Sequence, residues 1–591
     1  MNMFAVLTAF SLVVPVFVGS LLVKRISADI PPGLRVALGA ALGTAIAGTM
    51  YFLSLLLSDS SRVALATSES VLGAGLVILL WSRDRGLRNG TKAQPSNRFY
   101  ILIFAIVAIL AGAALIFDLD FAKHAGGDAL VIWNLRARLI ATSRTTPLSA
   151  ILDRVFLGFH PDYPLLLPAL VARGWQYTGR GTLVIPLALA SLFTIATVGI
   201  AVAGLRQIST YSQSWIAGCI LAGTPFLLGI GAAQFADIVV CCFMTAAVVL
   251  YGMYDLDLAF SRLPFLAGMA ASAAACTKNE GILFVLVLLT SRIAVAFVRR
   301  TWTRSWREML EFAAGASLGL LTLLIFKLTY SPPSEIVWAI TAQKLMAGMT
   351  NNQLNLTILR GFRNSLNFGQ WYLNPIPLMA IHAAVAWKPA PASTKIAPWF
   401  TATFVLIGML CGYYILYLVS PYDVEWHIQS SLDRLLVQLW PTCVVAYSVL
   451  ASSRSPGREC SAFSRGRALR IAAVLAVIAV TLAINAWPAQ ETQTWIVTGT
   501  RPHIELSRTE ITTGQSYTVK IPGIGGHHVY ISYTLDGTPM GQFATHIGTL
   551  GSAEFQVSPT TPKGTYRFLA IRKPEDSVWV SFENDVSITV K

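Results

Sequence analysis

The chain has 591 residues, of which 54% are hydrophobic and only 12% are charged. A soluble globular domain carries about 25% charged residues, so the composition excludes a soluble enzyme with a single membrane tail. It also excludes intrinsic disorder, which needs low hydrophobicity and high net charge. Most of the chain is therefore expected to lie in a lipid bilayer.

The net charge of +15 is carried outside the C-terminal region, because residues 489–591 hold eight Lys/Arg and nine Asp/Glu. Much of the positive charge falls in short segments between apolar stretches, which the positive-inside rule assigns to the cytoplasm. A nucleic-acid-binding protein would gather its charge on one soluble face, so no nucleic-acid partner is expected. The basic segments are 24–34, 83–98, 299–308 and 453–468.

About fourteen apolar segments approach the length of about 20 residues that a helix needs to cross a bilayer. The segment 264–277 is short, and 281–298 carries Arg292 within it. The predicted spans are 4–23, 35–57, 63–82, 99–117, 183–205, 214–232, 237–254, 264–277, 281–298, 309–329, 372–387, 396–419, 435–452 and 469–488.

Placing the basic segments in the cytoplasm puts the N-terminus and the C-terminal region on the extracytoplasmic side. The loops 118–182, 330–371 and 420–434 fall on the same side. We expect a three-helix transmembrane extension at 1–98, followed by a larger transmembrane module at 99–488 that carries these loops. The polar chemistry is then expected outside the cytoplasm.

Residues 489–591 have a different pattern, in which short alternating stretches are separated by turn signals such as Asp536-Gly537. Period-2 alternation at this spacing predicts an antiparallel β-sandwich, and the turn Lys563-Gly564-Thr565-Tyr566 is common in immunoglobulin-like folds. The expected fold is therefore an all-α polytopic membrane protein with a C-terminal all-β, immunoglobulin-like sandwich domain. Strands are predicted at 516–521, 528–534, 553–557, 564–571, 578–582 and 586–590.

The first long loop opens with acidic residues, Asp118, Asp120 and Asp128. After Gly126-Gly127, apolar residues at 130, 133, 135 and 139 indicate an amphipathic helix in the membrane interface. Asp128 would lie in its first turn, as a functional acid or as a helix cap favoured by the helix dipole. Asp118 and Asp120 are also typical of ordinary interfacial acids.

Further polar residues follow near the ends of predicted spans. His160 is either a ligand for a phosphate or sugar hydroxyl or a structural histidine. Asp237 opens a span, where an acid costs about 2.5–3.5 kcal/mol on insertion scales, so it is either a functional acid or an interfacial helix cap. Lys278 either pairs with Glu280 or faces an anionic headgroup. Arg434 either snorkels to the interface or offers a bidentate fork to phosphate.

Together these motifs resemble the GT-C superfamily of polytopic glycosyltransferases, nearest to the protein O-mannosyltransferase and aminoarabinose transferase branches. The resemblance covers roughly residues 99–450, and it departs from the family pattern at Ala129, usually a second acid, and at Leu435, usually Tyr. The matching motifs are Gly127-Asp128-Ala129-x-x-x-Trp133-x-x-Arg136-Ala137, His160-Pro161, Phe235-Ala236-Asp237, Thr277-Lys278-x-x-Gly281 and Arg434-Leu435-Leu436-x-x-x-x-Pro441.

The resemblance implies an inverting glycosyltransferase that moves a sugar from a polyprenyl phosphate to an extracytoplasmic glycan, lipid or protein, in a bacterial inner membrane. It implies that Asp128 or Asp120 is the general base and that Arg434 and Lys278 bind the donor phosphate. It leaves open whether a divalent cation takes part, and no metal ligand is assigned. The substrate-binding residues that it implies are Asp237, His160, Trp133, Arg136 and Glu280.

Two other functions fit a protein with many spans. A lipid-linked glycan polymerase or ligase would favour a large loop late in the chain. A transporter of lipid-linked glycans would place its polar residues near the bilayer midplane, whereas those described above gather at the outer ends of the predicted spans.

Overall fold

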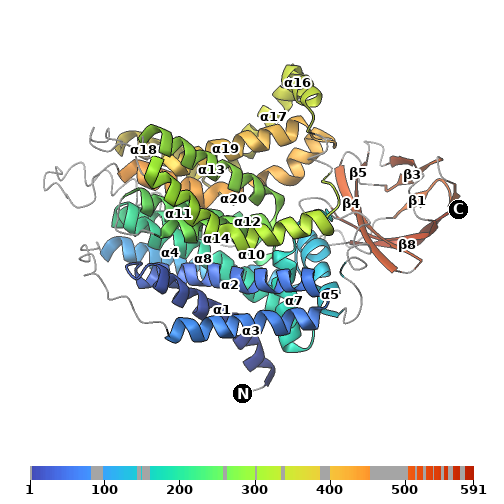
Figure 1. The fold of residues 1–591 in the computed structure, drawn as a ribbon. Coiled ribbons are helices and arrows are strands. Elements are labelled where there is room, and N and C mark those ends of the chain that lie inside the picture. Colours follow the sequence, from blue (N-terminus) through green and yellow to red (C-terminus); the bar gives the residue numbers. More distant parts are fainter. Residues whose placement is uncertain are drawn as a thin grey trace. The chain divides into compact units, whose positions relative to one another are not determined.

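The chain divides into two compact units, Met1–Pro488 and Ala489–Lys591. Figure 1 shows that the first is built of helices and the second of strands. The computed structural model describes residues 3–81, 98–142, 148, 160–256, 262–299, 302–334, 340–386, 400–452, 503–512, 515–522, 527–536, 538–547, 552–556, 563–572 and 580–591.

The helices of the first unit are long and apolar, and most run roughly parallel or antiparallel to one another (Figure 1). In chain order they are α1 (Met3–Ile26), α2 (Pro32–Ser58), α3 (Ser61–Trp81), α4 (Arg98–Phe121), α5 (Leu135–Thr142), α7 (Leu166–Thr178), α8 (Val184–Ile208), α9 (Tyr211–Ala222), α10 (Pro225–Ala232), α11 (Ala236–Asp255), α12 (Leu263–Thr277), α13 (Asn279–Arg299), α14 (Trp302–Thr329), α16 (Ala342–Thr350), α17 (Asn352–Asn364), α18 (Pro375–Ala386), α19 (Phe400–Leu418) and α20 (Val424–Ser452). A π-helical turn η1 (Ala129–Asn134) precedes α5, and a 3₁₀ turn η2 (Ser365–Asn367) follows α17.

Within the described residues, ten helices are long and apolar enough to cross a membrane, or eleven if the bent pair α9–α10 forms one span. Thirteen of the fourteen expected spans fall on this part of the chain, so the expectation is too high there. The expected spans at 264–277 and 372–387 correspond to α12 and α18, which have only 15 and 12 residues. The expected span 469–488 lies outside the described residues.

The expected span 214–232 is not one straight helix, because α9 and α10 meet at an angle of 59°. Pro225 at the start of α10 has no N–H to continue the ladder of α9, and it fixes the backbone for a new helix start. Nearby, the Thr224 hydroxyl oxygen lies 3.3 and 3.0 Å from the indole nitrogens of Trp371 and Trp440. These two tryptophans hold the break inside the bundle.

Two loops are shorter than expected because helices extend into them. α14 begins at Trp302, so most of the predicted basic loop 299–308 is helical. α20 begins at Val424, and Asp423 caps it by accepting a 2.8 Å hydrogen bond from the Trp426 amide. Arg434 therefore lies within a helix rather than at its first residue.

The first long loop also differs from the expectation. α4 continues to Phe121, so Asp118 and Asp120 lie in its last turns. The following helical segment buries Ile132, Trp133 and Ile140 in the protein core, and α5 packs against α7. Leu130 and Leu135, on which the predicted interfacial helix partly rested, stay 51% and 38% exposed, so the segment has one inner and one outer face.

The second unit contains two sheets that share one apolar core. The strands are β1 (Glu505–Leu506), β2 (Glu510–Ile511), β3 (Ser516–Lys520), β4 (His527–Leu535), β5 (Thr538–Ile547), β6 (Ser552–Gln556), β7 (Gly564–Arg572) and β8 (Val580–Val590). The sheet orders are β1-β3-β6 and β2-β8-β7-β4-β5. Val519 and Ala553 from the smaller sheet join the same cluster as Ile531 and Phe568 from the larger one.

Three details of this unit were not expected. β8 is a single strand of 11 residues where two strands were predicted, and β5 pairs with β4 through the hairpin at Asp536 although no strand was predicted there. The short pair β2–β8 is parallel, so the unit is not wholly antiparallel. β5 was missed because its polar and small residues lack strict alternation.

Arg292, which lies within the predicted span 281–298, is buried in α13 and paired with two carboxylates. Its guanidinium makes two bonds to the Asp255 carboxylate, at 2.8 and 2.9 Å, and one of 2.6 Å to Glu308. The guanidinium carbon also lies 4.3 Å from the ring centroid of Tyr251. The Arg292 charge can stay inside the bundle because α11 supplies Asp255 and α14 supplies Glu308 as its counterions.

We expect Arg292→Met to lower the free energy of unfolding by about 3–5 kcal/mol, because Asp255 and Glu308 would be left buried without their cation. Thermal unfolding of the detergent-solubilised protein would measure the loss. Arg62→Met is the matched control, since Arg62 is exposed at the start of α3. Equal unfolding temperatures for the two variants would mean that the buried cluster does not stabilise the fold.

Candidate functional site

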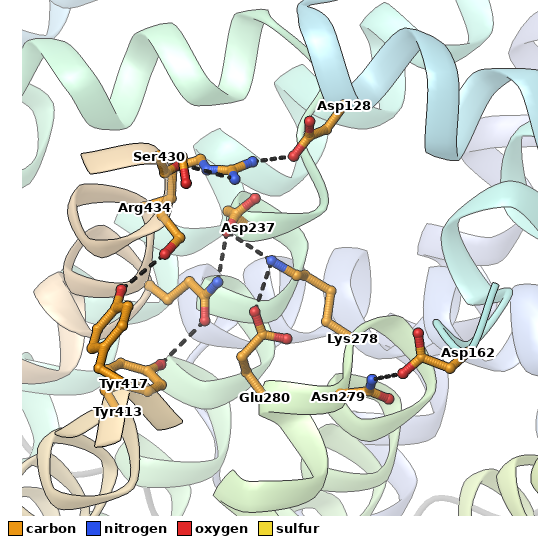
Figure 2. A network of polar contacts seen from close by, with 12 residues as sticks. Asp128, Asp162, Asp237, Lys278, Asn279, Glu280, Tyr413, Tyr417, Ser430 and Arg434 are labelled. Carbon is orange, nitrogen blue, oxygen red and sulfur yellow. Dashed lines mark hydrogen bonds and ion pairs between the residues drawn. The ribbon is translucent and has the colours of Figure 1, made fainter. Parts of the chain in front are cut away.

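The helix ends bring a group of charged side chains together at one end of the first unit. Asp237 lies in the first turn of α11, and Lys278 lies between α12 and α13. Asp128 precedes η1, and Arg434 comes from α20. Figure 2 shows these side chains pointing toward one another, with Asp237 between Arg434 and Lys278 in that view. We call Asp128, Asp237, Lys278, Glu280 and Arg434 the charge cluster.

Arg434 and Asp128 form an ion pair between segments 306 residues apart in the chain. A second guanidinium nitrogen of Arg434 donates a 3.1 Å bond to the Ser430 carbonyl, and the guanidinium lies 5.4 Å from the Phe235 ring centroid. The Asp128 side chain makes no capping hydrogen bond, so it is not the helix cap considered above. The Arg434 side chain is 25% exposed and that of Asp128 is 36% exposed, so another molecule can reach both.

The electrostatic surroundings keep Asp128 ionised. Desolvation by itself disfavours the charged form, but Arg434, with His160 and Lys278 nearby, holds the pKa of the Asp128 carboxyl below its usual value. The stability that this pairing contributes is present above the ordinary aspartate pKa and is lost as the pH falls through the lowered value. At neutral pH the site therefore presents a carboxylate.

Lys278 lies behind this pair and is almost fully enclosed, with 6% of the residue exposed. Its ammonium lies 3.1 Å from Asp237 Oδ1 and 2.9 Å from Glu280 Oε1. It also lies 5.7 Å from the ring centroid of Tyr163. The pairing of Lys278 with Glu280 is therefore only part of its environment, because Asp237, with 1% exposed, shares the same cation.

Gln438 is a member of the site that the sequence argument missed. Its amide nitrogen donates a 2.6 Å bond to Asp237 Oδ1, and its amide oxygen accepts a 3.3 Å bond from the Tyr413 hydroxyl. The signal was available, because Gln438 follows Arg434 by four residues in a helix and so lies on the same face. The Gln438 side chain therefore helps to orient the Asp237 carboxylate.

Three aromatic rings form a stack next to the charge cluster. Tyr163 stacks on His160 with centroids 4.8 Å apart and on Trp133 with centroids 5.6 Å apart. His160 has a φ of 45°, which is rare for a residue other than glycine, and its carbonyl accepts a 2.6 Å bond from Arg136. Trp133 and Arg136 are buried, so their direct role is to hold Tyr163 and the backbone of His160.

A second missed group ties the His160 turn to the helix ends. The Asn279 amide donates a 2.6 Å bond to Asp162 Oδ2, and the Asn279 oxygen accepts a 2.9 Å bond from the Lys327 ammonium. Lys327 also donates to the Asp162 carbonyl. These contacts join the first long loop, α13 and α14, which lie far apart in sequence, so no local pattern could reveal them.

Asp120, the alternative candidate base, contacts other residues than those of the charge cluster. Its carboxylate pairs with Lys123 at 3.1 Å on the same helical turn, and the Asp120 side chain is 82% exposed. It makes no contact with the charge cluster among the interactions of the described residues. The structure thus brings Asp128, and not Asp120, to the two cations.

The residues do not fit a divalent cation. Asp237 and Glu280 could offer carboxylate oxygens, but the Lys278 ammonium already stands between them. Across the ranges that the structure describes, no group of three or more His, Cys, Asp or Glu side chains is arranged to hold a metal ion. The charge cluster itself offers two cationic side chains, Arg434 and Lys278, to a substrate.

The arrangement combines an accessible carboxylate, an accessible guanidinium and a buried ammonium. Such a set can accept a proton and stabilise negative charge on an oxyanion or phosphate at the same place. Comparison with known proteins does not assign the chain to a family, because no family model, curated protein or solved structure matches it.

We expect Lys278→Met to lower the free energy of unfolding by about 3–5 kcal/mol, because it leaves two carboxylates buried without a cation. The double variant Lys278→Met/Asp237→Asn should recover part of this loss, since one of the two uncompensated charges is removed. Thermal unfolding with size-exclusion chromatography would measure both. A double variant no more stable than the single one would show that the charge balance is not what matters.

Proposed function

We propose that this protein is an integral-membrane glycosyltransferase that moves a sugar from a polyprenyl-phosphate donor to an extracytoplasmic glycan, lipid or protein. The observation that carries the proposal is the pairing of Asp128 with Arg434, next to Lys278 and Asp237, at the ends of apolar helices. A lipid-linked phosphate lies at the bilayer surface, so a base and cations are useful at this level. The resemblance to GT-C enzymes adds the reaction class.

The donor phosphate would bind Arg434 first. A guanidinium has five N–H donors, and Arg434 uses its contacts here on Asp128 and on the Ser430 carbonyl. A phosphate oxygen can exchange with the Asp128 carboxylate, because both are anionic acceptors of the same guanidinium. Lys278 stands further inside, where its charge adds to that of Arg434.

This exchange would make Asp128 a better base when it is needed. In the free site Arg434 is the main group that lowers the pKa of the carboxyl. Once the guanidinium turns to phosphate, the pKa of Asp128 rises and its affinity for the proton of the acceptor hydroxyl increases. By binding Arg434, the donor phosphate would thus free Asp128 to act as the base.

The chemical step is a direct displacement with inversion at the anomeric carbon. The acceptor oxygen forms a bond to that carbon, and the bond from the carbon to the phosphate oxygen breaks. Asp128 takes the proton of the acceptor hydroxyl, and polyprenyl phosphate leaves with the electron pair of the broken bond. Neutralisation of Asp128 and the growth of charge on the phosphate occur together, so the Arg434 guanidinium, released from Asp128, stabilises the phosphate and Lys278 adds its positive charge.

The remaining residues would position the substrates. His160 lies next to Asp128, and desolvation lowers the pKa of its imidazole although Asp128 and Asp162 partly oppose this. A neutral imidazole at pH 7 can donate to or accept from a sugar hydroxyl. Asp237 and Glu280 would orient Lys278, the cation that faces the leaving phosphate. Asp237, which Gln438 also holds, would in addition orient the sugar.

We place the site, the N-terminus and the second unit on the extracytoplasmic side of a bacterial inner membrane, from the distribution of Lys and Arg. The second unit would be an immunoglobulin-like sandwich, supported by its two sheets with one core. A transporter is less well supported, since four of the five residues of the charge cluster lie at or between helix ends, and only Arg434 lies further inside a helix.

The first test compares the envelope glycans of a deletion strain complemented with wild type, Asp128→Asn or Asp120→Asn. Mass spectrometry should find one sugar missing with Asp128→Asn and present with Asp120→Asn, because only Asp128 contacts Arg434. Polyprenyl-linked sugar should accumulate with the inactive variant. The reverse result would make Asp120 the base, and a full glycan profile without the gene would contradict the transferase function.

We expect Arg434→Lys to raise the KM for the donor by about tenfold, because an ammonium cannot form the bidentate contact that a guanidinium makes with phosphate. Transfer from the donor identified above, by protein in nanodiscs, would measure KM and kcat separately. Arg138→Lys is the matched control, since Arg138 is exposed on α5. An unchanged KM for Arg434→Lys would remove Arg434 from the phosphate site.

A further inference from the structure

The helices α16 and α17 form a pair at the same end of the helical unit as the charge cluster. α16 stands away from the packed helices in Figure 1, whereas α17 lies along α19 and α20. Both come from the segment between α14 and α18. Neither helix is long enough to cross a membrane, since they have 9 and 13 residues.

The pair exposes large apolar side chains on both helices. On α16, Met346 is 69% exposed and Met349 is 64% exposed. On α17, Leu356 is 47% exposed and Leu359 is 55% exposed. These residues recur at intervals of three on each helix, so each pair lies on one face. They are an apolar surface and not part of the core.

All the formal charge of residues 340–371, which include both helices, is positive. Lys344 lies on α16, Arg360 and Arg363 lie on α17, and no Asp or Glu occurs from residue 340 to residue 371. All three basic side chains are exposed, and none forms an ion pair with another residue in the described ranges. Arg360 and Arg363 follow Leu356 by four and seven residues, so the guanidinium groups and the leucines share one face.

The pair is held firmly in this position. The Asn355 amide donates bonds of 3.0 and 3.1 Å to the carbonyls of Gly348 and Met349, which closes the turn between the helices. The Tyr414 hydroxyl of α19 contacts the Asn355 side chain. Ile358 is fully buried, so α17 has an inner face distinct from its exposed one.

The depth of the α16–α17 pair relative to the membrane follows from the residues that it packs against. Gly348 packs against Leu418, the last residue of α19, and a Cβ atom at Gly348 would lie only 3.0 Å from the Leu418 carbonyl oxygen. Gly361 packs in the same way against Ile428, in the second turn of α20. The pair therefore lies beside the ends of two membrane-spanning helices, which is the depth of the lipid headgroups.

We propose that α16 and α17 form a lipid-binding element that lies in the headgroup region and binds anionic phospholipids of that leaflet. The four exposed apolar residues enter the boundary between headgroups and acyl chains. Arg360, Arg363 and Lys344 bind the lipid phosphates, as basic residues of interfacial helices do. A protein partner is less well matched, because this surface has one sign of charge and lies beside the ends of two apolar helices, α19 and α20.

Methionine oxidation can test this proposal in the intact protein. Full-length protein is placed in nanodiscs of phosphatidylcholine, or of phosphatidylcholine with phosphatidylglycerol, and treated with chloramine-T. Mass spectrometry then follows sulfoxide formation at Met346 and Met349. Met409, which is fully buried, reports whether each sample is folded.

We expect oxidation of Met346 and Met349 to be about fivefold slower in the anionic bilayer, the factor that one basic residue near such a surface contributes. Arg360→Gln/Arg363→Gln should lose this protection, and Arg360→Lys/Arg363→Lys should keep it. Arg508→Gln/Lys563→Gln removes the same charge from exposed positions of the second unit and should change nothing.

Three results would overturn the proposal. Equal oxidation rates in both bilayers would mean that the pair does not recognise anionic lipid. Protection that persists in Arg360→Gln/Arg363→Gln would mean that these arginines do not provide the binding. Oxidation of Met346 and Met349 that is equally slow in both bilayers, and becomes faster in nanodiscs that hold a single copy, would assign the surface to a second copy of the chain.

Discussion

The candidate site depends on one constraint, which is that a charge placed among apolar helices must be compensated by another chain segment. Lys278 satisfies it by lying between Asp237 and Glu280, and Gln438 supports Asp237 from α20. Because an unpaired buried charge costs several kcal/mol, these contacts fix how the first turns of α11 and α13 meet the middle of α20. The accessible pair of Asp128 and Arg434 lies next to these buried contacts.

The same constraint acts at a second place in the bundle, with a different outcome. Around Arg292 every partner is a protein side chain and the guanidinium is fully enclosed, so the cluster can only stabilise the fold. In the charge cluster the outer pair stays partly exposed. The two clusters differ because only the charge cluster has an exposed ion pair. A substrate can replace one member of an ion pair only where the pair is accessible, so the enclosed Arg292 cluster has a structural role alone.

The chain also divides its apolar surface between two kinds of element. The first long loop, predicted to lie in the interface, turns Trp133 and Ile140 inward and supports the aromatic stack beside the site. The pair α16–α17, which carried no prediction, exposes its apolar and basic residues instead. Both segments are amphipathic, so periodicity alone could not tell which one would bury its large apolar residues in the protein and which one would expose them.

From the sequence alone, the membrane-embedded class, most helix positions and the β-rich C-terminal region could be predicted, because hydrophobic length and alternation are local properties. Asp128, Asp237, Lys278 and Arg434 could be singled out because charges at the ends of apolar spans are rare. Only the tertiary structure decided that Asp128 and not Asp120 meets Arg434, that Gln438 and Asn279 join the network, and that α9 and α10 bend. These depend on contacts between segments distant in the chain, which no local pattern encodes.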